Sequence, residues 1–239
     1  MVLQTSNDEL RSIKAWERKR KETYASYLFL WFVIGLEATM IYDTAFSYVK
    51  KELHTSNTNL YYGLISAGRY LCPTFLGLPI SRWFDANRRL RLCTFYLNTS
   101  ILIGYVLYMI PLSPLFVLAG TCFYGSGFVL RSLMTSELLR VYENDEVQGK
   151  ILITGIVYGV GEMIGPLLVK LFEKIDFRLG GIHFTFCNIP SLVLIGLTIV
   201  RIIASYFFVH DVSLIHDLKQ QKENSIRVQH TIYQRQHML

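Results

Sequence analysis

Four charged side chains lie inside stretches that are otherwise strongly apolar: Glu37, Arg69, Arg131 and Glu162. A charge at the centre of a bilayer costs at least about 3 kcal/mol on insertion scales, so such residues usually face a partner or a water-filled cavity. Acids that exchange protons and arginines that bind anions are typical of solute and proton pathways. We therefore predict that these four residues line such a pathway.

The same side chains also have a purely structural interpretation. A fixed ion pair between two helices would only set their register, and a lone buried carboxyl group can stay protonated. We expect Arg69 to be the counter-ion of Glu37 or Glu162. For Glu162 the functional and the structural interpretations both stay open.

The composition indicates that these charges sit in a membrane protein. The chain of 239 residues is 51% hydrophobic and 14% aromatic, which is more apolar than an ordinary soluble domain of this length. A helix needs roughly 20 apolar residues to span the hydrocarbon core. Such stretches recur at residues 25–46, 60–81, 92–111, 115–135, 150–171 and 184–208. We predict an all-α membrane protein with a bundle of six transmembrane helices over residues 25–208.

The two ends of the chain are polar. A basic leader over residues 1–24 lacks a cleavage site and is expected to stay attached, and a polar tail over residues 209–239 is expected to have little fixed structure. Lys and Arg are concentrated in the leader, the tail and the loop after the second span, which predicts that both termini are cytosolic. The net charge of +6 then indicates attraction to anionic lipid headgroups of the bilayer and no binding of nucleic acid.

No constellation of catalytic residues accompanies the four charges. All histidines lie in loops, at a span edge or in the tail, which argues against a membrane serine protease and against a histidine-rich metal oxidase. Asp43 lies too near the membrane edge for a paired-aspartate protease. We expect no enzymatic activity, no catalytic residue, no metal and no cofactor. Arg201, near the cytosolic end of the last span, is expected to reach the headgroups and receives no role.

The basic loop carries a recognisable motif. The stretch "GLPISRWFDANRRLRL" contains Gly77, Arg82, Asp85, Arg88 and Arg89. It resembles the Gly-x-x-x-Asp-Arg-x-Gly-Arg-Arg loop between helices two and three of the major facilitator superfamily, with a serine where the aspartate usually stands. In that family the loop is a conformational element, and the resemblance implies the same role here.

A second motif lies in the fifth predicted span. "GEMIGP", with Gly161, Gly165 and Pro166, is similar to the Gly-x-x-x-Gly-Pro pattern of helix five in the same superfamily. Residues 25–210 most resemble the branch that contains a lysosomal facilitator associated with ceroid lipofuscinosis and its SPX-linked relatives. The likeness covers the N-terminal half of a twelve-helix transporter, so the tail would begin the linker between the halves.

This resemblance implies a secondary active transporter for a small solute, proton-coupled and placed in an internal membrane such as the endolysosomal one. Facilitators bind substrate between two halves, so the expected partner is a second six-helix half or a second copy of the chain. The alternative is a truncated facilitator that does not transport and instead binds or regulates a full-length relative. In that superfamily helices one and four line the central cavity, so the resemblance implies that Glu37 and Arg131 face it. We expect the glycines of the fifth span to permit close helix contact, and we expect these glycines and Glu162 to lie on the surface that faces the other half.

Overall fold

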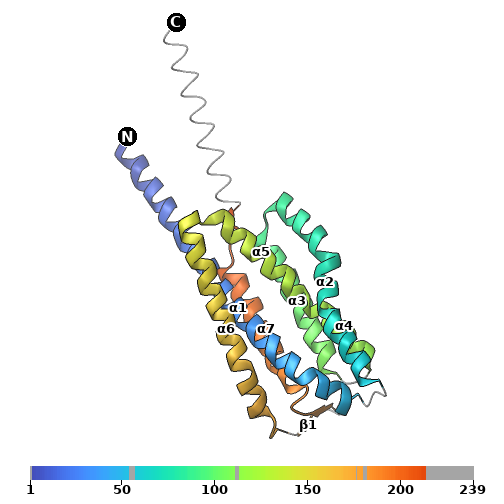
Figure 1. The fold of residues 1–239 in the computed structure, drawn as a ribbon. Coiled ribbons are helices and arrows are strands. Elements are labelled where there is room, and N and C mark those ends of the chain that lie inside the picture. The colour runs from blue at the N-terminus through green and yellow to red at the C-terminus, as the bar shows by residue number, and fades with distance from the viewer. Residues whose placement is uncertain (1, 54–56, 111–112, 176, 180–181, 214–239) are drawn as a thin grey trace.

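The computed structural model describes residues 2–53, 57–110, 113–175, 177–179 and 182–213, and this part of the chain is predominantly helical (Figure 1). The helices are α1 (Val2–Lys51), α2 (Thr58–Asn87), α3 (Leu90–Met109), α4 (Pro114–Tyr124), α5 (Ser126–Val141), α6 (Asn144–Phe172) and α7 (Ile189–Phe208). A short antiparallel hairpin of β1 (Phe177–Leu179) and β2 (Ile182–Phe184) separates α6 from α7.

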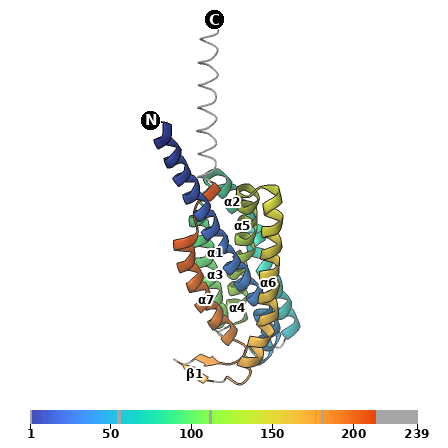
Figure 2. The same ribbon diagram turned by 90° about the vertical axis from the view of Figure 1, so that its left-hand side faces the viewer.

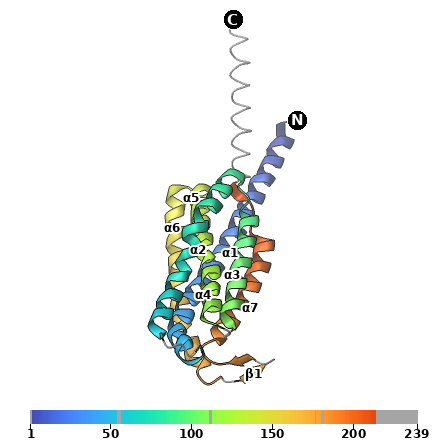
Figure 3. The ribbon, with the colours of Figure 1, turned by 90° about the vertical axis from the view of Figure 1, so that its right-hand side faces the viewer.

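Five segments are long and apolar enough to cross a membrane: Lys14–Lys51, Leu90–Met109, Pro114–Val141, Asp145–Phe172 and Ile189–Phe208. The third of these joins α4 and α5 into one rod, because Gly125 between them keeps a right-handed helical backbone. The rods lie side by side in all three views (Figures 1, 2 and 3). The described part of the chain is therefore predominantly helical, with five segments suited to crossing a membrane.

The second predicted span differs from the others. Residues 60–81 fall within α2, which packs against α4 and α5 but is not among the five apolar segments. Arg69 and two internal prolines, Pro73 and Pro79, interrupt its apolar run. A sixth transmembrane span therefore stays a prediction.

The helices do not begin at two of the predicted boundaries. The leader and the first predicted span belong to one helix, because α1 begins at Val2 and runs through residue 24 without a break. Its Lys, Arg and Glu residues are good helix formers, and Arg18 and Glu22 form an ion pair of 2.7 Å one turn apart. The last span begins later than residue 184, because β2 occupies residues 182–184 and Pro190 stands in the first turn of α7, a position that favours proline.

The start of α1, the α2–α3 connection and the end of α7 lie at one end of the bundle, and the hairpin lies at the other (Figures 1 and 2). Residues 209–213 dock at this end, where the His210 backbone N–H donates to Thr23 Oγ1 at 3.1 Å and the Ser213 N–H donates to Glu137 Oε1 at 2.9 Å. The start of the tail is thus fixed on α1 and α5. The expectation for residues 214–239 lies outside the described residues.

Tyr142, in the connection between α5 and α6, anchors basic side chains at the same end. Burial raises the pKa of its hydroxyl to about 12, so the ring stays neutral at physiological pH. The Arg20 guanidinium lies 4.5 Å from the ring centre and the Lys150 ammonium 5.5 Å from it. These cation–π contacts hold α1 and α6 together beside the connection.

Candidate functional site

Helices α1 and α6 approach each other closely at glycines. A Cβ atom on Gly161 would lie 2.5 Å from the Phe32 carbonyl oxygen, one on Gly165 would collide with the Thr39 hydroxyl, and one on Gly35 would collide with the backbone of α6. The glycines of α6 therefore permit close helix contact, as expected. The expectation that this small-residue surface faces a second half is wrong for Gly161 and Gly165, because they pack on α1 of the same chain.

Two further glycines of α6, and Gly77 and Pro166 of the two motifs, make looser contacts. A Cβ atom on Gly155 or Gly159 would meet nothing within 4 Å, and one on Gly77 would make only an ordinary contact at 4.0 Å. Pro166 lies within α6 on its exposed side. Gly155, Gly159 and Pro166 thus leave one side of α6 open to lipid or to a partner.

The basic loop is fastened to a neighbouring helix. Asp85 forms ion pairs with Arg88 at 3.3 Å and with Arg140, at the end of α5, at 2.8 Å. Arg88 ends α2 in the left-handed conformation with φ 54°, and Arg89 is the residue before α3. Arg82 is exposed. Asp85 therefore couples the α2–α3 connection to the α4–α5 rod.

Glu37 is the acid at the centre of the bundle. Its side chain on α1 is only 5% exposed, and the Tyr105 hydroxyl of α3 donates a hydrogen bond of 2.6 Å to its Oε2. The Tyr105 ring stacks on Tyr124 of α4 with 5.6 Å between ring centres. Arg69 from α2 and Arg201 from α7 act electrostatically on the carboxyl group, although neither forms a direct ion pair with it among the described residues.

Arg201 contradicts the sequence-based expectation. Its side chain is 1% exposed, and Nε, Nη1 and Nη2 have no hydrogen-bond partner within the described part of the chain. It does not reach the headgroups, because it lies on the inward face of α7 with Leu194, Thr198 and Ser205, which are all buried. This face repeats every three or four residues, and that helical periodicity was the signal that could have identified it.

Arg131 and Glu162 belong to a second cluster, built on α1, α5 and α6. The Arg131 guanidinium lies 4.2 Å from the centre of the Trp31 ring and 5.3 Å from that of Tyr158. The Glu162 carboxylate and the Arg131 guanidinium both act electrostatically on the Tyr158 hydroxyl. Glu162 therefore lies near an arginine that packs on aromatic rings, an arrangement that stabilises charge in apolar surroundings.

Arg69 acts on both Glu37 and the cluster that contains Arg131 and Glu162. Its guanidinium packs on the rings of Phe128 and Tyr70, 5.1 and 5.6 Å from their centres, and it acts electrostatically on both Glu37 and Tyr158. It forms no ion pair with Glu162 among the residues described. All four predicted charges thus lie in neighbouring groups of side chains. Of the two acids, Glu37 is the one on which Arg69 acts electrostatically.

The part of the chain that the structure describes contains no group of three or more His, Cys, Asp or Glu side chains that could hold a metal ion. No protein-family model, no curated protein and no solved structure matches the chain. Inference about function therefore rests on the arrangement of the charged and aromatic side chains.

Proposed function

We propose that the chain is one six-helix half of a facilitator-type secondary transporter, which moves a small solute across an internal membrane in exchange with, or together with, protons. The observation that carries this proposal is Glu37, buried at the centre of the bundle with Tyr105 bonded to it and Arg69 and Arg201 nearby. Buried charges of this kind in a membrane protein are costly and are typical of ion and proton pathways. Glu37 is the proposed proton-exchanging group.

A small solute that carries a carboxylate fits the arginines best. Arg131 and Arg69 are both partly exposed and both packed on aromatic rings. A guanidinium held in this way can bind a carboxylate through two parallel hydrogen bonds. We therefore favour an anionic or zwitterionic solute, with Arg131 or Arg69 as the group that binds it.

A second six-helix unit would complete the transporter. Facilitators hold substrate between two halves that rock against each other, and the open side of α6 offers a surface for such a unit. The unit could be a second copy or a related half, and an endolysosomal membrane is the location implied by the family resemblance. If the chain binds a full-length relative without moving solute, the regulatory alternative holds instead.

Transport by the full chain, reconstituted at high protein density in vesicles with a trapped pH-sensitive dye, tests this function. We expect one class among amino acids, monocarboxylates, dicarboxylates and sugars to cause proton movement, and we expect Glu37→Gln to slow that movement by about tenfold or more. Asp43→Asn is the control, because Asp43 is exposed on the same helix and should leave the rate unchanged. An unchanged rate in Glu37→Gln would exclude Glu37 as the coupling group.

The sixth span is tested by the accessibility of epitope tags. In cells whose plasma membrane alone is permeabilised, tags at Met1 and Leu239 should be digested by added protease, and a tag in the α1–α2 connection should be protected. The reason is that six spans return the chain to its starting side, with the basic segments in the cytosol. Full detergent lysis is the control that exposes every tag. Opposite accessibility of the two termini would show that α2 does not cross the membrane.

A further inference from the structure

The interface between α3 and α7 contains polar groups that the protein leaves unpaired. Asn98 donates through Nδ2 to Ser205 Oγ at 3.3 Å, but Asn98 Oδ1, Thr198 Oγ1 and the three guanidinium nitrogens of Arg201 have no hydrogen-bond partner among the described residues. All these side chains are buried. An unsatisfied buried polar group destabilises the folded state, and buried water is the usual means by which proteins satisfy such groups.

The unpaired groups follow one another along the interface. One helical turn along α7 leads from Ser205 to Arg201, and a second turn leads to Thr198. On α3, which runs antiparallel, two turns lead from Asn98 to Tyr105, and Arg201 acts electrostatically on Tyr105 and on Glu37. The polar seam, defined here as Ser205, Asn98, Arg201 and Tyr105, therefore ends at the hydroxyl that is bonded to Glu37.

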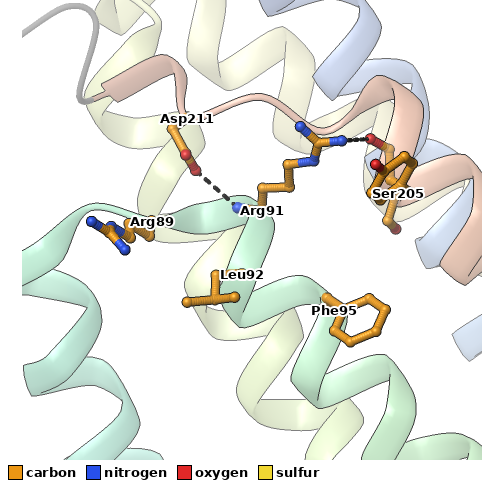
Figure 4. Close-up of a pocket in the computed structure, with 7 residues that line it drawn as sticks. Arg89, Arg91, Leu92, Phe95, Ser205 and Asp211 are labelled. Carbon is orange, nitrogen blue, oxygen red and sulfur yellow. Dashed lines mark hydrogen bonds between the residues drawn. The ribbon is translucent and has the colours of Figure 1, made fainter.

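A pocket of about 340 Å³ lies at the Ser205 end of the seam (Figure 4). Ser205 lines this pocket together with Arg91 and Asp211. The Arg91 backbone N–H donates to Asp211 at 2.9 Å, and its guanidinium donates to the Tyr206 carbonyl oxygen, so the polar wall is held in place. Ser205 therefore belongs both to the polar seam and to the lining of the pocket.

We propose that water bound along the polar seam forms a proton path from this pocket to Glu37. A proton that binds the Glu37 carboxylate leaves a neighbouring water oxygen, which takes one from the next water, so that one proton moves inward from the pocket for each one bound. The groups that face Glu37 are Arg69 of α2, Tyr105 of α3, Tyr124 of α4 and Arg201 of α7.

This path rests on the proposed proton exchange at Glu37, and infrared difference spectroscopy of the reconstituted full chain tests it apart from transport. The signal is the carboxylic-acid C=O band that Glu37→Gln removes, followed after a pH jump. We expect Asn98→Leu and Ser205→Ala to slow its appearance by about tenfold or more. Ser205→Ala removes a single oxygen and keeps the test valid if Asn98→Leu fails to fold.

Thr99→Val is the matched control, because Thr99 neighbours Asn98 on α3 but bonds only to the Phe95 carbonyl of its own helix. It should respond as the unmodified chain does. If the Glu37 band appears at the unmodified rate in both seam variants, the path is wrong while proton exchange at Glu37 stands. If no band depends on Glu37, the path and the proposed coupling both fail.

Discussion

Gly161→Leu should leave little folded protein, because α6 could no longer pack against α1. Even a Cβ atom at this position would lie 2.5 Å from the Phe32 carbonyl oxygen and 3.0 Å from the Leu36 backbone nitrogen. Both neighbours are backbone atoms, which can move only if the helices separate. Overpacking of a core typically costs about 1–3 kcal/mol even when side chains can adjust, and we expect a larger loss here. The yield of monodisperse protein and the thermal unfolding midpoint in detergent measure it.

Gly159→Leu is the control for this prediction. It places the same side chain two residues earlier on α6, where a Cβ atom meets nothing within 4 Å, so the protein should fold with an unchanged midpoint. A comparable loss in both variants would mean that α6 tolerates no leucine on either side, and the α1–α6 contact would not be the cause. A normal midpoint with impaired pairing of copies would place the open side of α6 at the contact between two units.

Arg201→Met should destabilise the folded chain by about 0.5–3 kcal/mol, because it removes a buried positive charge that acts electrostatically on the Glu37 carboxyl group. Glu37 is the acid on which Arg201 acts, so adding Glu37→Gln should recover part of the loss. The free energy of unfolding of the two single variants and the double variant gives the coupling, for which we expect about 0.5–3 kcal/mol.

Arg69→Met provides the comparison, since Arg69 also acts on Glu37 but is partly exposed and supported by aromatic rings. Its coupling to Glu37 should be the smaller one. A larger coupling for Arg69 would make it the main counter-ion of Glu37, in agreement with the expectation from sequence. Additive losses for both arginines would show that neither is paired with the acid.

Several features of the fold were predictable because they depend on local composition. A stretch of about 20 apolar residues needs its backbone hydrogen bonds satisfied internally, and a helix does this regardless of its neighbours. The membrane character of the chain and five of its helical rods follow from this rule. The ends of these rods were less predictable, because good helix formers extend α1 to Val2 and a short hairpin delays the start of α7.

The partners of the charged residues were less accessible to prediction. Arg69, Glu37, Arg131 and Glu162 stood out because a charge in an apolar run is visible in any sequence. Which of them meet could not be known, because pairing depends on the rotation and depth of each helix. The aromatic support of Arg131 by Trp31 on α1 and Tyr158 on α6 joins residues far apart in the chain.

Length and hydropathy are properties of each segment alone, so the apolar helices and the few costly charges in them can be recognised in the sequence. The position of Arg201 inside the bundle near Glu37, and the packing of Gly161 on α1 of the same chain, depend on how the helices pack. Lipid is as apolar as a helix interface. Hydrophobicity therefore hardly distinguishes the two sides of a membrane helix, and the side that faces inward is selected by close packing and by the pairing of polar groups.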